Sequence, residues 1–405
     1  MKAYPLSFEN TEHAFAYKTT KELKKARLLF FTMGYRWIVQ LGILVTPWAL
    51  KIGLPVKGLI RRTIYDQFVG GETLMETASV ARRLEKYQVK VILDYGVEGK
   101  EEESTFDHSC EEFVRVVQYA ATQPSIPFIS IKVTGFARFS LLEKLDKASS
   151  GKEGYRGIVR LEVLNAEEKA EWWRVVGRME KIMDVAAQGK VSVLVDAEES
   201  WIQDPVDALT MQMMEKYNGS RAVVYNTIQL YRTDRLQFLK DSFEASVSKS
   251  FLPAVKLVRG AYMEKERKRA AAFNYPSPIQ SGKIDCDADY NEAIQFAVSN
   301  IEHLAVVIAS HNEKSNLMAT DLINASSVAH DHPHIHFSQL FGMSDNITFN
   351  LARSGYSVSK YLPFGPIHDV IPYLMRRASE NSSVSGQTGK ELSLINKEIA
   401  RRKGQ

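Results

Sequence analysis

The sequence predicts an α/β fold, a TIM-type (β/α)8 barrel preceded by a helical N-terminal arm. From about residue 88 the chain repeats one pattern eight times: a short apolar run, a polar or glycine-containing turn, and an amphipathic helical stretch. The apolar runs are continuous rather than alternating, which is typical of parallel strands covered on both faces. Eight such units in about 300 residues are what this kind of barrel needs.

Each apolar run is short and rich in Val, Ile and Leu, as expected of a buried strand. The eight expected strands are Val89–Leu93, Phe128–Val133, Val191–Val195, Ala222–Leu230, Val255–Val258, Leu304–Ile308, Ile335–Leu340 and Tyr356–Leu362.

The stretches between the runs carry helix signals. Asn165 and Glu168 have the spacing of a capping box, and Gly189 is expected to end that helix as a C′ glycine. Asp204-Pro205 is expected to open the next helix. Two further helices are expected at Ser315–Ser326 and Ile367–Ser379.

The main competing fold is a doubly wound open sheet, which usually has a glycine-rich dinucleotide turn after its first strand. Here the first run continues into Asp94–Gly99 without a G-x-G-x-x-G pattern. The sequence therefore favours the barrel. We expect residues 1–87 to form the helical arm, residues 88–395 the (β/α)8 barrel, and residues 396–405 a polar tail.

Composition narrows the class of protein. The 405 residues contain 45% apolar and 25% charged residues with a net charge of +4, which is ordinary for a globular protein and sparse for a nucleic-acid binder. Cys110 and Cys286 match no metal spacing, so we expect no metal site and two free thiols in a reducing compartment. We expect a cytoplasmic location, with the inner face of a membrane or the mitochondrion as alternatives.

The run Trp37–Leu50 is strongly apolar but too short to span a bilayer, which takes about 20 residues. Residues 1–25 have mixed charges and no apolar core, unlike a signal peptide. We expect the run to be a buried helix. The alternative is an amphipathic contact with a bilayer, supported by Lys51, Lys57 and Arg61-Arg62.

Polar side chains stand at nearly every strand end, where the chemistry of a barrel is found. Each alone is explained by a solvated strand end, but together they predict a large, net-basic pocket suited to an anion. They are Lys132, Asp196, Glu198, Asn226, Gln229, Lys256, Arg259, Ser310, His311, Gln339, Lys360 and Tyr361.

Two segments are more specific. Lys256–Tyr262 (KLVRGAY) is a strand with two cations that ends in Gly-Ala, where small residues let the backbone approach a ligand. In the helix after the last strand, Tyr373, Arg376, Arg377 and Glu380 lie on roughly the opposite face from an apolar stripe. Either that face is simply solvated, or the two arginines, held by Glu380, clamp a planar carboxylate.

KLVRGAY, the segment VDAEE at Val195–Glu199, and the series Tyr361, Tyr373, Arg376-Arg377, Glu380 together resemble proline dehydrogenase. The resemblance runs from about residue 88 to residue 385, and the chain is closer to the stand-alone members than to the fused bifunctional ones. It implies a distorted (β/α)8 barrel with FAD as cofactor. It also implies oxidation of L-proline to Δ1-pyrroline-5-carboxylate by hydride transfer to flavin N5, as the first step of proline catabolism to glutamate, with electrons passed to a membrane quinone.

The resemblance also implies roles for the substrate site. Arg376 and Arg377 match the family's carboxylate clamp, Glu380 the acid that orients it, and Lys132 a lysine near the carboxylate. Tyr361 and Tyr373 match tyrosines that wall the proline ring. No residue of the sequence is an evident base for the substrate amine.

Further matches concern the cofactor. Gln229 matches the residue that hydrogen-bonds the isoalloxazine edge, Arg259-Gly260-Ala261 the segment that holds the dinucleotide, and Ser310-His311 a pair that touches FAD. Gln339 falls near the adenosine end. Asp196 matches an active-site acid. Lys256 stands where many bacterial members have arginine close to flavin N5, so the contact with the flavin is expected to differ here.

Three alternatives remain open from the sequence. A hydroxyproline dehydrogenase of the same family differs only in its pocket walls. A barrel aldolase would use Lys132, Lys256 or Lys360 as a Schiff-base lysine. A catalytically silent barrel would bind a small anion or a partner protein. The sequence predicts no nucleic-acid partner and leaves the oligomeric state open.

Overall fold

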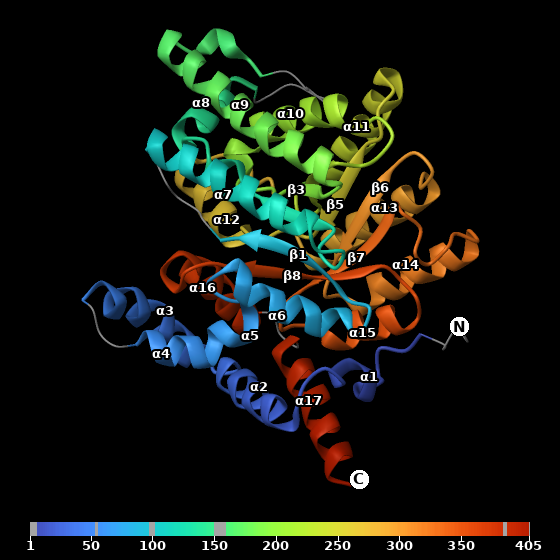
Figure 1. Cartoon of the computed structure of the whole chain (residues 1–405). Helices are drawn as coiled ribbons and strands as arrows, with labels where there is room; N and C mark the ends of the chain where they lie inside the picture. The colour runs from blue at the N-terminus through green and yellow to red at the C-terminus, as the bar shows by residue number, and fades with distance from the viewer. Residues whose placement is uncertain (1–5, 53–55, 97–101, 150–158, 384–386, 405) are drawn as a thin grey trace. The chain divides into compact units, whose positions relative to one another are not determined.

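All eight expected strands are present, and in the computed structural model of the chain they form one closed parallel barrel in chain order (Figure 1). The fold class is therefore confirmed. The strands are β1 Lys90–Tyr95, β2 Phe128–Ile131, β3 Ser192–Val195, β4 Val224–Gln229, β5 Ala254–Val258, β6 Ala305–Ala309, β7 Ile335–Leu340 and β8 Val358–Phe364. The structure describes residues 6–52, 56–96, 102–149, 159–383 and 387–404, without the side chains of residues 47–51, 380–383 and 387.

Strand register sets which side chains enter the barrel. Thr227 of β4 pairs with Lys256 of β5, which pairs with Val307 of β6, so these three share one face. Lys256 contacts Asp196, which follows β3, a strand that does not neighbour β5. Such a contact passes only through the barrel interior, so this shared face points inward.

Aromatic residues fill the interior near the starts of the strands. Phe128, the first residue of β2, lies 5.7 Å from the ring of Tyr225 on β4 and 4.9 Å from that of His336 on β7, centre to centre. These strands do not neighbour one another in the barrel. The packed floor leaves the carboxyl ends of the strands for polar chemistry.

By contacts the chain forms two compact units, one of residues 1–97 and 338–405 and the other of residues 98–337. The helices and helical turns of the second unit are α7 Glu103–Ala121, η2 Val133–Gly135, α8 Phe139–Ser149, η3 Leu161–Val163, α9 Ala166–Gly189, α10 Ser200–Tyr217, α11 Arg235–Lys249, α12 Met263–Phe273, α13 Lys283–Ser299 and α14 Glu313–Ala325.

Two helix ends in this unit differ from expectation. The capping box of Asn165 and Glu168 opens α9 as predicted, but Lys190, not Gly189, takes the left-handed conformation that ends it. Gly189 is the last helical residue, where a Cβ would lie 2.8 Å from that of Ala121. The prediction for Pro205 is wrong: α10 begins at Ser200, whose backbone N–H donates to the Glu266 carboxylate, and the proline lies inside the helix.

The first unit contains the N-terminal helices, β1, β8 and the C-terminal helices. Those helices are α1 Thr11–Phe15, α2 Thr20–Met33, α3 Arg36–Lys51, α4 Lys57–Ile60, the π-helical turn η1 Arg61–Tyr65, α5 Asp66–Phe68, α6 Leu74–Glu85, α15 Asp345–Arg353, α16 Ile367–Ser383 and α17 Gln387–Lys403. The segment for which we expected a polar tail is the second half of α17. Ile399 in this segment and Ile395 just before it are buried in one apolar core with Phe30 of α2 and Leu374 of α16. Burial, and not charge content, therefore decides the structure of the segment.

The apolar run Trp37–Leu50 lies in α3, and the expectation that it is buried is wrong for much of its described part. Val39 is buried, but Trp37 and Leu44 are 66% and 75% exposed. No single helix among the described residues is long and apolar enough to cross a membrane; α2 and the start of α3, bent by 94°, reach that length and composition only as a pair.

Candidate functional site

Three of the predicted residues meet inside the barrel of the second unit. Asp196 accepts a hydrogen bond from the Lys256 ammonium, and its other oxygen lies 3.8 Å from Lys132 Nζ. Ser130 Oγ donates to the same carboxylate at 2.7 Å. Lys132 and Asp196 directly follow β2 and β3, and Lys256 lies within β5, so strand geometry fixes their separation.

The charge state of this cluster follows from its composition. Burial by itself would raise the pKa of Asp196, but attraction by Lys256 and Lys132 outweighs it and holds the pKa below its usual value. Asp196 is therefore ionised, and the cluster of two lysines and one aspartate carries one net positive charge. An excess cation in a mostly buried pocket favours an anionic or electron-rich ligand.

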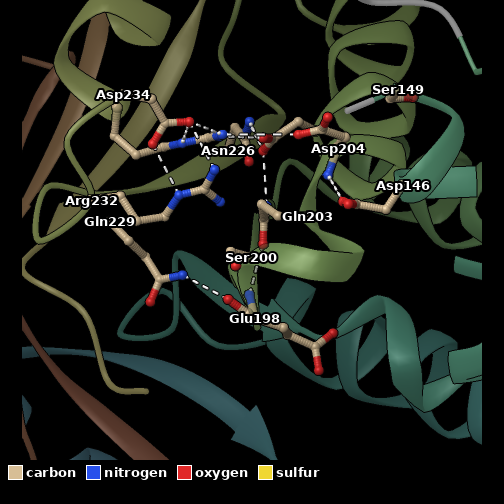
Figure 2. Close-up of polar contacts among 12 residues, drawn as sticks. Asp146, Ser149, Glu198, Ser200, Gln203, Asp204, Asn226, Gln229, Arg232 and Asp234 are labelled. Carbon is tan, nitrogen blue, oxygen red and sulfur yellow. Dashed lines mark hydrogen bonds and ion pairs between the residues drawn. The ribbon is translucent and has the colours of Figure 1, made fainter. Parts of the chain in front are cut away.

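Glu198 and Gln229 form a second group at the ends of β3 and β4. Thr134 Oγ1 donates to Glu198 Oε2 at 2.5 Å. Gln229 Nε2 donates to the Glu198 carbonyl at 2.8 Å (Figure 2). The Gln229 side chain is thereby held at the barrel mouth by the backbone of the neighbouring loop. Burial raises the pKa of Glu198 to about 7, against the opposing effect of the Thr134 hydrogen bond.

A buried network behind the barrel supports this group (Figure 2). Gln203 of α10 accepts from the Glu198 backbone N–H at 2.8 Å and donates to Asp207 at 2.9 Å. Asp207 in turn accepts from Asn226 at 2.9 Å and from Arg235 at 2.5 Å. Asn226, one of the strand-end residues, therefore points to the helices and not into the barrel.

We expect Glu198→Gln to change the pH dependence of stability. The folded state holds the Glu198 proton up to about pH 7, whereas the unfolded chain loses it near its ordinary value of 4.5. Between these values the unfolded state binds fewer protons, so the unfolding free energy falls as pH rises. The unfolding free energy of the variant does not fall in this way. Relative to the wild type it should therefore rise by up to about 3 kcal/mol between pH 4.5 and pH 8. Urea unfolding of both proteins across that range measures the difference; parallel profiles would contradict it.

The turn after β5 builds a third group around Arg259. Its guanidinium donates to Asp287 at 2.7 Å, to Ser310 at 2.7 Å and to Ser315 at 2.9 Å. Its carbon lies 4.2 Å from the centre of the Tyr290 ring. Arg259 and Ser310, predicted to share a ligand, are thus brought together, and the guanidinium is held by three hydrogen bonds while its side chain is 23% exposed.

Gly260 needs to be glycine. Its φ is +139°, and a Cβ would meet the Tyr231 ring at 2.5 Å. Gly260 and Ala261 are both exposed, so their backbone is accessible beside the Arg259 guanidinium. His311 follows Ser310 and is half-buried.

The remaining predicted residues belong to the first unit. Gln339 is buried, and its amide oxygen accepts from Thr348 of α15 at 2.8 Å. Tyr373 is buried, and the Arg377 guanidinium carbon lies 5.3 Å from the centre of its ring. Arg377 is 9% exposed, while Arg376 and Tyr361 are half-buried. The helix face of the arginines is therefore not freely solvated; the Glu380 side chain lies outside the described residues.

Lys360 does not belong to the strand-end pocket. Its ammonium lies 2.9 Å from Asp345 of α15 and donates to the carbonyl of Met343, and the side chain is fully buried. Strand alternation places it on the helix-facing side of β8, opposite to Tyr361. The sequence could not show this, because the apolar run gives no alternation to distinguish the two faces.

Several supporting residues were missed from the sequence. Ser130 and Thr134 each hold a strand-end carboxylate, and Asp287 and Ser315 hold Arg259. The last two lie in or beside helices far along the chain, and single polar residues there carry no pattern. No group of three His, Cys, Asp or Glu able to hold a metal occurs in the described part of the chain, and both cysteines are free and buried.

Comparison with known proteins points to one family. The family model for proline dehydrogenase matches residues 77–390. The chain is 34% identical over 385 residues to proline dehydrogenase 1, mitochondrial, of Dictyostelium discoideum, covering 87% of this chain and 67% of the relative. It is 34% identical to a carbapenem antibiotics biosynthesis protein of Pectobacterium carotovorum subsp. carotovorum (85% and 86% covered) and 30% identical to the hydroxyproline dehydrogenase of Xenopus laevis (85% and 78% covered).

Among solved structures, proline utilization A from Bdellovibrio bacteriovorus superposes with a TM-score of 0.75 at 17% identity. The match covers 95% of this chain and 44% of that protein, so the chain spans less than half of its length. At this identity the likeness shows the shared fold.

Proposed function

This chain belongs to the proline dehydrogenase family, and we propose that it oxidises L-proline to Δ1-pyrroline-5-carboxylate with FAD, as the first step of proline catabolism to glutamate. The observation that carries the proposal is the buried Lys132–Asp196–Lys256 cluster, which keeps one excess positive charge inside the barrel. This charge suits both an amino acid carboxylate and an electron-rich reduced cofactor.

The residues around Gly260 fit FAD. The bare glycine backbone is exposed beside a guanidinium fixed by three hydrogen bonds, which suits a pyrophosphate. On the inner face of β4, the buried hydroxyl of Thr227 has no hydrogen-bond partner among the described residues, as expected where a ligand completes a site. We assign FAD binding to Gln229, Lys256, Arg259, Gly260, Ala261, Ser310, His311 and Gln339. When bound, FAD would accept the hydride that leaves the substrate.

The chain's own residues then bind and orient the substrate. Arg376 and Arg377 hold the carboxylate as a pair, with Glu380 orienting them, and Lys132 adds a cation. Tyr361 and Tyr373 provide flat apolar faces for the five-membered ring. Asp196 pairs with both Lys132 and Lys256, and Lys256 supplies positive charge where the electrons arrive.

The electrons leave to a membrane quinone, so the proposal includes a peripheral contact with a membrane and a location at its inner face. A second candidate is a hydroxyproline dehydrogenase, favoured by the 30% identity to the Xenopus laevis enzyme over 85% of this chain. The two enzymes differ in whether the pocket accepts a hydroxyl on the proline ring. A pocket that has no hydrogen-bond partner for this hydroxyl discriminates against it only weakly.

The decisive experiment records the visible spectrum of the purified chain and then adds substrate without oxygen. We expect flavin bands that bleach with L-proline and less readily with trans-4-hydroxyproline. The reverse preference would favour the second candidate. A chain that binds no flavin would exclude the proposal, and a borohydride-trapped lysine adduct would then indicate an aldolase.

Gly260→Ala is the structural control for that spectrum. The strained φ and the 2.5 Å clash with Tyr231 should displace the turn and weaken FAD binding by roughly tenfold or more. Gly219→Ala is the matched variant, because a Cβ there meets nothing within 4 Å, and it should retain its flavin.

A further inference from the structure

The exposed apolar side chains of this protein are concentrated in one segment. Half of the large apolar residues exposed in the described parts of the chain lie between residues 28 and 59, on α2, α3 and α4 and in the segment beside them. They are Leu28, Phe31, Tyr35, Trp37, Leu41, Leu44, Val45, Ile52 and Leu59. Such a contiguous concentration marks a surface that is covered in use.

These residues form two helical stripes. Leu28 and Phe31 follow one face of α2 and lead to Tyr35, and Trp37, Leu41 and Leu44 follow one face of α3. At the bend between the helices, the rings of Phe31 and Tyr35 lie 5.4 Å apart, which joins the two stripes. We call this surface the apolar face.

The same segment is strongly basic. Residues 20–62 contain nine Lys or Arg and a single acidic residue, Glu22, whereas the rest of the chain has 43 basic and 47 acidic residues. Taken as a whole, the rest of the chain therefore carries a net charge of −4, whereas this segment carries +8. Lys24, Arg27 and Arg62 are exposed and make no ion pair among the described residues.

We propose that the apolar face docks the protein on an anionic lipid bilayer, with its aromatic and aliphatic side chains at the acyl boundary and the surrounding cations at the lipid phosphates. Exposed Trp, Leu and Phe beside unpaired Lys and Arg are the combination that binds a membrane surface.

Docking is peripheral and not a membrane span. The other side of α2 presents Leu23, Ala26 and Phe30 to the apolar core of its unit, where they pack with α16 and α17 residues. Moving α2 into the bilayer would expose that core, so only the outer stripe is available to lipid.

The docked surface also contains the mouth of a cleft of about 760 Å³. Leu28 and Leu29 line one side, and Val69 and Gly70 line another, where the Gly70 backbone N–H donates to Pro363 at the carboxyl end of β8. A cleft of this size suits a small ring system. Its use by a lipid-soluble electron acceptor rests on the proposed function; the docking itself does not.

The test measures partition of the purified full chain onto vesicles of phosphatidylglycerol and phosphatidylcholine, by flotation. We expect binding that disappears in 0.5 M salt or on pure phosphatidylcholine, because both remove the attraction between the cations and the lipid phosphates. Each cation should raise the partition constant about fivefold. The triple variant Lys24→Gln/Arg27→Gln/Arg62→Gln should bind about 100-fold less. Trp37→Ser/Leu44→Ser should bind roughly tenfold less or weaker.

Matched controls come from the other unit. Trp173 and Ile284 are exposed apolar residues, and Lys169, Lys268 and Lys314 are exposed lysines without ion pairs among the described residues. Trp173→Ser/Ile284→Ser and the triple Gln variant of those lysines should bind like the wild type. Equal losses in the controls, equal binding to neutral vesicles, or binding that resists salt and carbonate would each overturn the proposal.

Enzyme assays separate this proposal from the proposed function. With proline as donor, the docking variants should reduce a soluble dye at the wild-type rate but lose reduction of a quinone held in vesicles. A wild type that binds vesicles but never reduces the dye would sink the proposed function and leave docking intact. A wild type that reduces the dye but does not float with any vesicle would overturn docking and leave the proposed function intact.

Discussion

Arg377→Met raises the KM for L-proline by about 100-fold, and Arg376→Met does so by at least tenfold, while FAD stays bound. In the proposed site each guanidinium would give the substrate carboxylate charge-assisted hydrogen bonds, whose loss would cost about 1.5–3 kcal/mol. Arg377 is the more buried of the two and is fixed against the Tyr373 ring, so its loss is less well replaced by water. Methionine keeps most of the volume and removes only the charge and the donors.

The matched measurements isolate the clamp. Pyrrolidine has the ring without the carboxylate, so its KM should be unchanged in both variants. Arg377→Lys keeps the charge without the fork and should be intermediate. Arg82→Met, at an exposed arginine of α6, should behave as the wild type. If the KM for proline were unchanged in both clamp variants, neither arginine would bind the carboxylate.

The barrel could be predicted because its signal is repeated and local. Continuous apolar runs such as Val191–Val195 and Leu304–Ile308 are hard to place anywhere except in strands covered on both faces, and the structure has β3 and β6 there. Helix ends were less certain, since they depend on single contacts. Ser200 begins α10 because the distant Glu266 accepts from its backbone, which no local pattern at Asp204-Pro205 reveals.

The site was predictable only as far as strand position determines it. Lys132, Asp196 and Lys256 were expected to meet because strand ends converge at one edge of a barrel, and they do. Lys360 has the same kind of position in sequence but faces Asp345 on the outside, since a fully apolar strand hides which residues point inward. The exposed half of α3 was missed for a related reason: apolar content predicts burial on average, and only the packing of α2 and α16 shows which side stays uncovered.

If the proposed function holds, Lys256→Met lowers turnover by about 100-fold and shifts the flavin midpoint potential downward by about 40 mV, with a small change in KM. Lys256 and Lys132 both contact the Asp196 carboxylate, so removing Lys256 takes one positive charge out of this buried cluster. A unit charge at 4 Å is worth about 4 kcal/mol at an effective dielectric of 20. If half of that energy stabilises the reduced, electron-rich cofactor, the midpoint potential changes by about 40 mV for two electrons.

The opposite sign is expected from Asp196→Asn. That substitution leaves both lysines without their shared carboxylate and raises the net charge of the pocket by one, so the potential should move upward. Lys256→Arg restores the charge and should therefore bring the midpoint potential most of the way back to the wild-type value. Its turnover shows how well a guanidinium replaces the ammonium at this position. Spectroelectrochemical titration of the three variants measures the shifts. If Lys256→Met and Asp196→Asn moved the potential in the same direction, the cluster would act through folding and not through its charge.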